Sequence, residues 1–354
     1  MAFVEAKIGK RIGVVNRETN PSKQPAPRRY VAGLSFGSSS SAMTRVLDNS
    51  AKYHSSRESS TAFEPLVVHI DTDLSTPSGE STPAQRLLEE YKETFQNVKF
   101  DRVPLEKALE LDTIDWSTLQ ISKDGDAREA LDGFLAKLPS VTSRVDVTRL
   151  LVRHLLLDIT ITGSYNALML GHNTTSLAAL TLSEVANGRG FSVPWQVNDG
   201  PYNVHSHTLQ STEPDTSTTK ASVPLYYPMR EVFRNEVLTY VDLTPLLRRL
   251  IQDDERRRQA VVSHKDTSID DVMTRYFDGV EGPFAGIVAN VVRTSGKLVK
   301  RVAEDFCGLC GLGLDEFGDS RWAGELGEDG FDEHDAAPSR GGRLCYGCRR
   351  SIYA

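Results

Sequence analysis

Short apolar runs alternate with segments of helical spacing along the first half of the chain, and this alternation constrains the fold more than any other feature. Apolar runs at 30–34, 66–70 and 165–170 are typical of strands buried on both faces of a parallel sheet. Each run leads through a loop into a segment with the 3.6-residue periodicity of a helix. This order predicts an α/β fold with a doubly wound parallel sheet.

Three loops are predicted to meet where ligands bind in such sheets, at the carboxyl ends of the strands. The first is a serine-rich turn that enters a helix, so its N–H groups and hydroxyls can face a phosphate. It is not a Walker loop, because no Gly-Lys-Ser/Thr follows. The candidate pocket residues are Ser35, Phe36, Gly37, Ser38, Ser39 and Ser40 in the first loop, Asp71 in the second, and Gly171, His172 and Asn173 in the third.

All four cysteines lie in the last 48 residues, as two CxxC pairs: Cys307 with Cys310, and Cys345 with Cys348. Paired CxxC turns suit tetrahedral zinc, and four thiolates leave no open position for catalysis. The 34 residues between the pairs require an inserted loop, and residues 315–335 carry nine acidic residues and one Arg, as expected of a hydrated excursion. Structural zinc is predicted, with an iron–sulfur site or a disulfide pair as the alternatives.

The remaining sequence predicts a helix-rich C-terminal half. We expect a basic N-terminal helix and Pro-rich connector at 1–29, the α/β domain at 30–240, a helical segment at 241–306 and the cysteine module at 307–354. The polar, turn-rich stretch 201–221 predicts a surface loop. Helical spacing is found at 230–240, 243–258 and 284–306.

Charge and hydropathy limit the partners that the chain can have. No stretch is long and apolar enough to span a bilayer, so an intracellular, cytoplasmic protein without membrane contact is expected. The net charge of −7 excludes a uniformly basic nucleic-acid binder. Local basic clusters remain, and they are either solvated ends or RNA contacts; their candidate residues are Lys7, Lys10, Arg11, Arg349 and Arg350.

The order of the three loops resembles the PP-loop ATP pyrophosphatase family (adenine nucleotide alpha hydrolase-like), whose first strand leads into an SGGxDS loop. Ser35, Gly37 and Ser40 match that loop, whereas Phe36 replaces a glycine and Ser39 replaces the aspartate. The segment VVHIDTDL resembles the second strand of the family, and Gly171-His172-Asn173 resembles the start of its GHNxDDxAE motif.

The acidic residues of these motifs are missing from this chain. Thr175 and Ser176 stand where the resemblance places two aspartates, and Ala179 where it places a glutamate. ATP chemistry needs Mg²⁺, which binds carboxylates, and Phe36 crowds a position where glycine lets the backbone approach. No cysteine precedes Cys307, so no sulfur nucleophile is expected in the pocket. Efficient ATP turnover is therefore not expected, and nucleotide binding stays open.

Taken in order, these motifs resemble the cytoplasmic tRNA 2-thiolation protein 2 family. AFVEAKIGKRIGVV, SFGSSSSAM, GHNTTSLAALTLSEVANGRG, VPLYYPMREVFRNEVLTYV, FCGLCGLGL and LCYGCRRSI carry the similarity. The family pattern includes a further cysteine-rich finger before the basic helix, which this sequence does not contain. The resemblance implies a non-catalytic subunit that pairs with a catalytic PP-loop thiolase and acts on the wobble uridine (U34) of tRNAs for Lys, Glu and Gln, with a ubiquitin-related sulfur carrier and a link to protein urmylation.

Two other hypotheses stay open. The chain itself is an ATP-dependent thiolase in one, and a zinc-ribbon module for protein interaction in the other. His205 and His207 form an HxH pair in a polar loop without carboxylate or cysteine companions, so a metal site there is not favoured.

Overall fold

The structure is a computed structural model, and it describes residues 2–19, 27–56, 62–77, 79–119, 121, 125–207, 219–251, 267–314 and 344–353. The acidic stretch 315–335 lies outside the described residues, as do residues 252–266.

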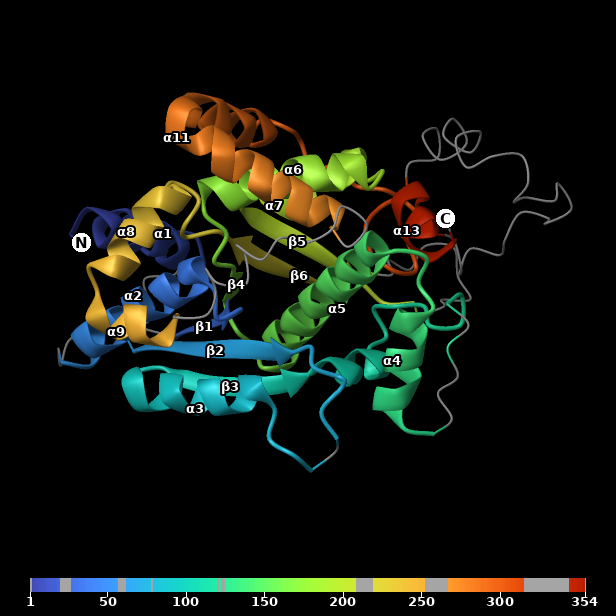
Figure 1. Cartoon of the computed structure of the whole chain (residues 1–354), viewed down its shortest axis with the longest axis horizontal. Helices are drawn as coiled ribbons and strands as arrows, with labels where there is room; N and C mark the ends of the chain where they lie inside the picture. The colour runs from blue at the N-terminus through green and yellow to red at the C-terminus, as the bar shows by residue number, and fades with distance from the viewer. Residues whose placement is uncertain are drawn as a thin grey trace, which may run out of the picture.

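Six strands form one twisted sheet in the order β3-β2-β1-β4-β6-β5 (Figure 1). Neighbouring strands pair in parallel except β5, which is antiparallel to β6. The strands are β1 (Arg28–Gly33), β2 (Phe63–Asp71), β3 (Lys99–Pro104), β4 (Ala167–Met169), β5 (Gly200–His205) and β6 (Thr219–Tyr226). The predicted doubly wound parallel sheet is confirmed, with one antiparallel strand added at its edge.

Helices cover both faces of the sheet (Figure 1). Two of the helices that follow strands begin with known helix-start signals. Thr82 is the N-cap of α3, with Pro83 in the first helical position, and Asn173 is the N-cap of α6. The α-helices are α1 (Ala2–Thr19), α2 (Ser38–Ser55), α3 (Pro83–Thr94), α4 (Ala127–Ala136), α5 (Val141–Thr162), α6 (Thr174–Ala186), α7 (Val193–Val197), α8 (Arg234–Asp242), α9 (Pro245–Leu250), α11 (Ile269–Ser295) and α13 (Tyr346–Tyr353). Two 3₁₀ helices are η1 (Leu105–Glu110) and η2 (Gly190–Ser192).

Two hydrophobic cores lie on opposite faces of the sheet. Successive strand residues point to opposite faces, so Val31 enters one core while Tyr30 and Ala32 enter the other. The first core joins the sheet to α5, α6, α11 and the cysteine module. The second joins it to α1, α2, α3, α8 and α9, with Ile8 of α1 fully buried. The basic N-terminal helix is thus part of the folded core.

Two expectations about the second half were wrong. The stretch 201–221 is not a loop throughout, because its two ends form β5 and the start of β6; Tyr202 and Val204 alternate with more exposed residues and bury their side chains in the first core. Residues 208–218 lie outside the described residues. The helix expected at 284–306 begins earlier, at Ile269, and ends at Ser295, where Gly296 is the C-cap; Phe284 interrupts it with non-helical angles after Pro283.

No helix within the described ranges combines the length and the apolar character that a membrane span needs.

Candidate functional site

A pocket of about 490 Å³ opens at the carboxyl ends of β1, β2 and β4. Backbone and side chains of the serine-rich loop line it, together with Gly171, His172 and Asn173. All three predicted loops meet at this pocket, the second through His69, Ile70 and Thr72 at the end of β2. Close approach depends on Gly171, because a Cβ there would lie 2.8 Å from the Cα of Ser40.

The serine-rich loop is held by its own hydroxyl groups. Ser40 donates to the carbonyl of Gly37 at 3.1 Å and accepts from the N–H of Ser35 at 3.2 Å. Phe36 has a positive φ of 59°, in the left-handed region that favours glycine. Its ring packs against His69 and Tyr91, with ring centroids 4.3 and 5.2 Å away, so aromatic contacts hold the residue in this conformation.

Hydroxyl groups of Ser39, Thr175 and Ser176 occupy three of the positions where the resemblance places acids, and Ala179 occupies the fourth. Asn173 donates from Nδ2 to Ser39 Oγ at 2.9 Å and accepts from the N–H of Ser176 at 2.8 Å. This one side chain therefore ties the first loop to the start of α6. Neutral groups that bond to one another in this way leave no negative charge for Mg²⁺.

Thr175 bonds to a carboxylate that comes from a distant helix. Its hydroxyl donates to Glu281 of α11, which is buried, and Glu281 also accepts the N–H groups of Arg234 at 3.2 Å and Asn235 at 2.8 Å. The carboxylate thus caps the first turn of α8 and is committed to the fold. Sequence reasoning missed Glu281, since 106 residues separate it from Thr175 and no local pattern links them.

Among the described residues, the one carboxylate that lines the pocket is Asp278, and it pairs with Arg234 at 3.2 Å. His172 also lines the pocket and stays neutral, because burial, with smaller contributions from Arg153 and Arg149, lowers its pKa to about 3. Nδ1 of His172 is buried and has no hydrogen-bond partner among the described residues. The pocket can admit a ligand, but it offers no free carboxylate to a metal ion.

Asp71 lies beside the pocket and does not line it. Its buried carboxylate accepts hydrogen bonds from Thr82 at 2.6 Å and Arg102 at 2.8 Å. Although burial opposes ionisation, these bonds lower the pKa of Asp71 below its usual value. Asp71 therefore holds the end of β2 to α3 and β3.

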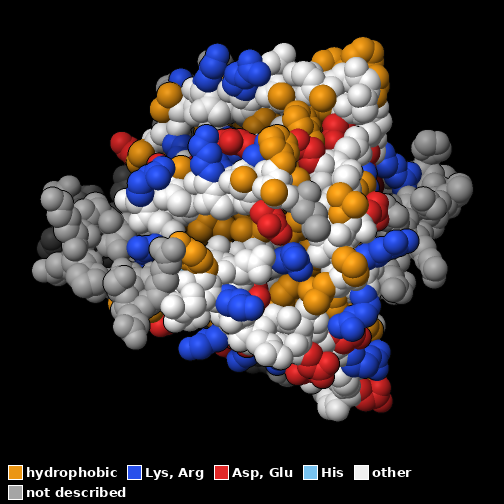
Figure 2. Space-filling view, turned by 90° about the vertical axis from the view of Figure 1, so that its left-hand side faces the viewer, with side chains coloured by type: hydrophobic (Ala, Val, Ile, Leu, Met, Phe, Trp, Pro, Cys, Tyr) orange, Lys and Arg blue, Asp and Glu red, His pale blue; other side chains and the backbone are white. Residues whose placement is uncertain are grey.

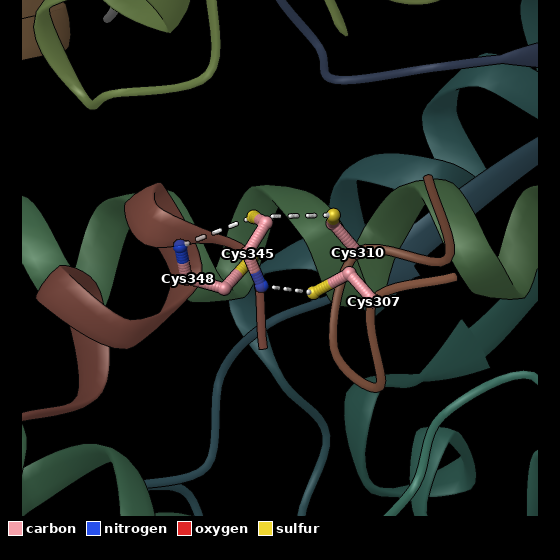
Figure 3. A group of neighbouring side chains, drawn as sticks. All are labelled: Cys307, Cys310, Cys345 and Cys348. Carbon is pink, nitrogen blue, oxygen red and sulfur yellow. Dashed lines mark hydrogen bonds between the residues drawn. The ribbon is translucent and has the colours of Figure 1, made fainter. Parts of the chain in front are cut away.

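The four cysteines lie together at the opposite end of the sequence, and all four are buried (Figure 3). Their sulfur atoms lie within 4.8 Å of one another, and Cys310 Sγ and Cys345 Sγ are 3.9 Å apart. Backbone N–H groups point at the sulfurs: that of Cys345 donates to Cys307 Sγ at 3.3 Å. The first pair sits on a turn closed by a bridge between Phe306 and Gly313, and the second pair leads into α13. This geometry is compatible with one bound metal ion.

A buried ion network supports the cysteine module. Arg189 is fully buried and bonds to Glu184 at 2.9 Å and to Asp146 at 2.9 Å; its Nη1 also lies 3.9 Å from Cys348 Sγ. Ser351 of α13 donates to Asp146 at 2.7 Å. The network joins α5, the end of α6 and α13, so that the module is fixed to the sheet domain.

Close backbone contacts complete this attachment. A Cβ at Gly347, between the second pair of cysteines, would lie 2.4 Å from the carbonyl oxygen of Asn187. His154 of α5 donates from Nε2 to the carbonyl of Leu309 at 3.0 Å, and its Nδ1 is hydrogen-bonded to the hydroxyl of Thr113 at 2.9 Å. Sequence reasoning missed both Arg189 and His154. Arg189 directly follows the Asn-Gly that ends a helix, and a cation is rarely buried at such a position.

The HxH pair borders the first cysteine turn. The ring of His205 stacks on Phe306, with centroids 3.3 Å apart, and burial lowers the pKa of His205 to about 4. The backbone N–H of His207 donates to the carbonyl of Asp112 at 2.8 Å. Within the described residues, these histidines do not belong to a group that could hold a metal ion.

The candidate RNA contacts differ in their availability. Lys7 pairs with Glu236 at 3.0 Å, and Arg11 pairs with Asp199 and Glu231. Lys10 is exposed. Arg350 donates to the carbonyl of Ala186 at 3.0 Å and is exposed. Arg349 is half-buried and has interactions of its own. Figure 2 views the side where α1, α8 and α9 lie, and Lys and Arg side chains are spread over it among fewer Asp and Glu side chains.

The fold and the two sites define an α/β protein with a doubly wound sheet, a serine-rich loop at the carboxyl ends of its strands, and a four-cysteine module in its C-terminal part. The model of the family "Cytoplasmic tRNA 2-thiolation protein 2" matches residues 268–329. The chain belongs to the cytoplasmic tRNA 2-thiolation protein 2 family.

Relatives that carry this name match almost the whole chain. The protein from Phaeosphaeria nodorum is 34% identical, with 99% of this chain and 87% of the relative covered. The protein from Pyrenophora tritici-repentis is 32% identical, with 99% and 88% covered. Among solved structures, the chain resembles the U34-tRNA thiolase NcsA from Methanococcus maripaludis, which has a [4Fe-4S] cluster; the TM-score is 0.49 and the identity 14%, with 91% of this chain and 86% of that chain covered.

Proposed function

We propose that this chain is the non-catalytic subunit of a cytoplasmic complex that 2-thiolates the wobble uridine, U34, of tRNAs such as those for Lys, Glu and Gln. A catalytic PP-loop homologue is its partner in a heterodimer, and a ubiquitin-related carrier supplies the sulfur and links the complex to protein urmylation. Membership of the family supports the pathway. The replacement of pocket acids by a neutral network around Asn173 is the observation that carries the non-catalytic role.

Activation of a uridine oxygen by ATP needs negative groups that hold Mg²⁺ near the phosphates. The described pocket offers Asp278 alone, and Arg234 neutralises it. Sulfur transfer in addition needs a thiolate or a cluster, and no cysteine precedes Cys307 in the sequence. The chain therefore contributes binding surface and shape, while its partner performs the chemistry.

Zinc is the metal that we propose for the four cysteines. With Zn–S bonds of about 2.3 Å, a tetrahedron has sulfur–sulfur edges of about 3.8 Å. Cys310 and Cys345 already lie at 3.9 Å. A cubane cluster binds each cysteine to a different iron and so needs a wider spacing. The ion would hold structure and take no part in catalysis, because four thiolates fill its coordination sphere.

We assign contacts to the tRNA backbone to cations near the two ends of the chain, of which Lys10 and Arg350 are exposed and Arg349 is half-buried. Lys10 is available for a phosphate contact, and Arg349 and Arg350 lie on α13. Lys7 and Arg11 are already in ion pairs, so RNA must compete with Glu236 and Asp199 for them. Such contacts give an affinity that falls as salt rises.

The test is reconstitution with the PP-loop homologue from the same organism and a sulfide donor. Thiolated tRNA is measured by retardation in a mercury-containing gel under single-turnover conditions. We expect product when both chains are present and none from this chain alone. Product from this chain alone would mean that it is itself a thiolase, and equal product from the homologue alone would show that this chain is not a subunit of the active complex.

A further inference from the structure

The described chain concentrates its exposed apolar side chains in one stretch. Of fifteen large hydrophobic residues that are exposed in the described ranges, seven lie between Val272 and Val302. Val299 and Val302 are the most exposed of all, at 78% each, and Leu298 beside them is 48% exposed. Single exposed aliphatic residues are ordinary, whereas a cluster of them marks an interaction surface.

The segment that carries Leu298, Val299 and Val302 is held in place by contacts that its backbone and its neighbouring residues make with the rest of the protein. Lys300 donates to the carbonyl of Pro201 at 2.8 Å, and its ammonium lies 5.4 Å from the centre of the Trp195 ring. Trp195 in turn donates from Nε1 to the carbonyl of Arg301 at 3.1 Å. Asn198 donates to the carbonyl of Leu298 at 3.4 Å. These contacts fix the backbone of residues 298–301 to α7, β5 and the residues between them, so the exposed valines have a defined position on the surface.

Three exposed basic residues flank the valines along the chain, and one exposed acid, Glu304, follows them. Arg293, Lys297 and Arg301 are exposed, and none of the three has an ion pair among the described residues. The acids that precede them are committed: Asp278 pairs with Arg234, and Glu281 caps α8. Leu298, Val299 and Val302 with Arg293, Lys297 and Arg301 are called the basic apolar ridge below. The ridge lies within the segment that the family model matches.

We propose that the basic apolar ridge is the docking surface for a different protein chain, one that presents apolar side chains inside a rim of Asp and Glu. Aliphatic valines and leucine bury well against protein side chains, whereas single-stranded RNA is bound by aromatic rings that stack on bases. A second copy of this chain is disfavoured, because a two-fold interface would place the basic rim against itself.

The inference rests on the proposed function, because the partner used to test it is the catalytic PP-loop homologue. An apolar centre with a charged rim fits the anatomy of a stable protein interface. Because the rim of this ridge is basic, we expect the homologue to carry an acidic surface where the two chains meet. It also predicts salt-dependent association, since exposed charges steer the encounter.

The experiment measures binding of the full-length chain to the purified homologue by biolayer interferometry at several salt concentrations. The variant Val299→Asp/Val302→Asp is compared with Leu243→Asp/Leu246→Asp, a control pair with the same spacing, 55% and 36% exposed; Leu243 is the C-cap of α8 and Leu246 lies in α9. We expect the ridge variant to bind at least about tenfold more weakly, as for central interface residues, and the control to bind like the wild type. Reversal of Arg293, Lys297 and Arg301 to Glu should slow association and remove most of its salt dependence.

Metal content and thermal unfolding verify that each variant is folded. A ridge variant that is folded and binds the homologue like the wild type overturns the docking surface while the proposed function stands. If the wild-type chain forms no complex with the homologue, both fail. A ridge variant that loses tRNA binding but keeps the homologue identifies RNA as the occupant and overturns the inference. A wild-type dimer that the ridge variant converts to a monomer overturns it in favour of a second copy.

Discussion

The pocket and the cysteine module differ in the chemical groups that they can offer to a ligand. In the pocket, Gly171 packs closely on Ser40, and the neutral side chains of Asn173 and Ser39 are hydrogen-bonded to each other. The module keeps four buried thiols and a fully buried arginine beneath them. The two regions therefore differ in what they offer a ligand: the pocket offers mainly neutral polar groups, and the module offers four thiols that can share one metal ion.

The largest effect is expected from removal of a cysteine. Cys345→Ser should lose the metal and unfold the C-terminal module, a loss of more than about 5 kcal/mol, because the binding free energy of structural zinc is folding free energy. Elemental analysis should find about one zinc per wild-type chain and none in the variant. His207→Ala is the control, since His207 lies near the module without belonging to its ligand group. Zinc retained by the cysteine variant would contradict the assignment.

Substitution of the buried arginine should be the next most damaging change. Arg189→Met removes the fully buried one of the two arginines that pair with the buried carboxylates of Asp146 and Glu184, and leaves them only the partly exposed Arg149. The free energy of unfolding should fall by about 3 to 5 kcal/mol, as when one partner of a buried ion pair is removed. Urea denaturation measures this, with Arg350→Met as an exposed control. Equal stability of the two variants would show that the network does not anchor the module.

A smaller effect is expected at Phe36, whose positive φ strains the backbone of the serine-rich loop. Phe36→Ala loses the ring contacts with His69 and Tyr91 but keeps the side chain at a positive φ. Phe36→Gly loses the same contacts and relieves the strain. The glycine variant should therefore be more stable than the alanine variant by about 1 kcal/mol, the reverse of their order in ordinary backbone. Thermal unfolding of both variants decides it, and a more stable alanine variant would refute the strain.

The smallest effect is expected from the surface cations. Lys10→Glu should weaken tRNA binding by less than about tenfold and make the slope of log affinity against log salt about 1 unit shallower. Lys7→Glu should act mainly on stability, because Lys7 already pairs with Glu236. Filter binding over a salt series compares the two. An equal change of slope for both variants would show that the ion pair of Lys7 opens to RNA.

Local signals made part of this structure predictable. The spacing of Cys307, Cys310, Cys345 and Cys348 predicted one cluster, and the apolar runs predicted the parallel sheet, because both depend on residues that are close in sequence. The substitution of Phe36 was also visible, although its positive φ was not.

What escaped the sequence depends on contacts between distant segments. Glu281 reaches Thr175 only after α11 has packed on α6, and Arg189, which follows α6, reaches Asp146 of α5 only in the folded chain. The edge strand β5 was read as loop because its polar residues face outward, while Tyr202 and Val204 fill the core. Such pairings depend on tertiary packing, so no local periodicity in the sequence predicts them.

The central claim is that this chain adds no ATP chemistry of its own. The most direct measurement is pyrophosphate release by the reconstituted complex in which the aspartate of the homologue's own SGGxDS loop has been changed to asparagine. The homologue is then inactive, and any release must come from the pocket around Ser39 and Thr175. The account predicts release no faster than without protein; tRNA-dependent release from this complex would contradict it.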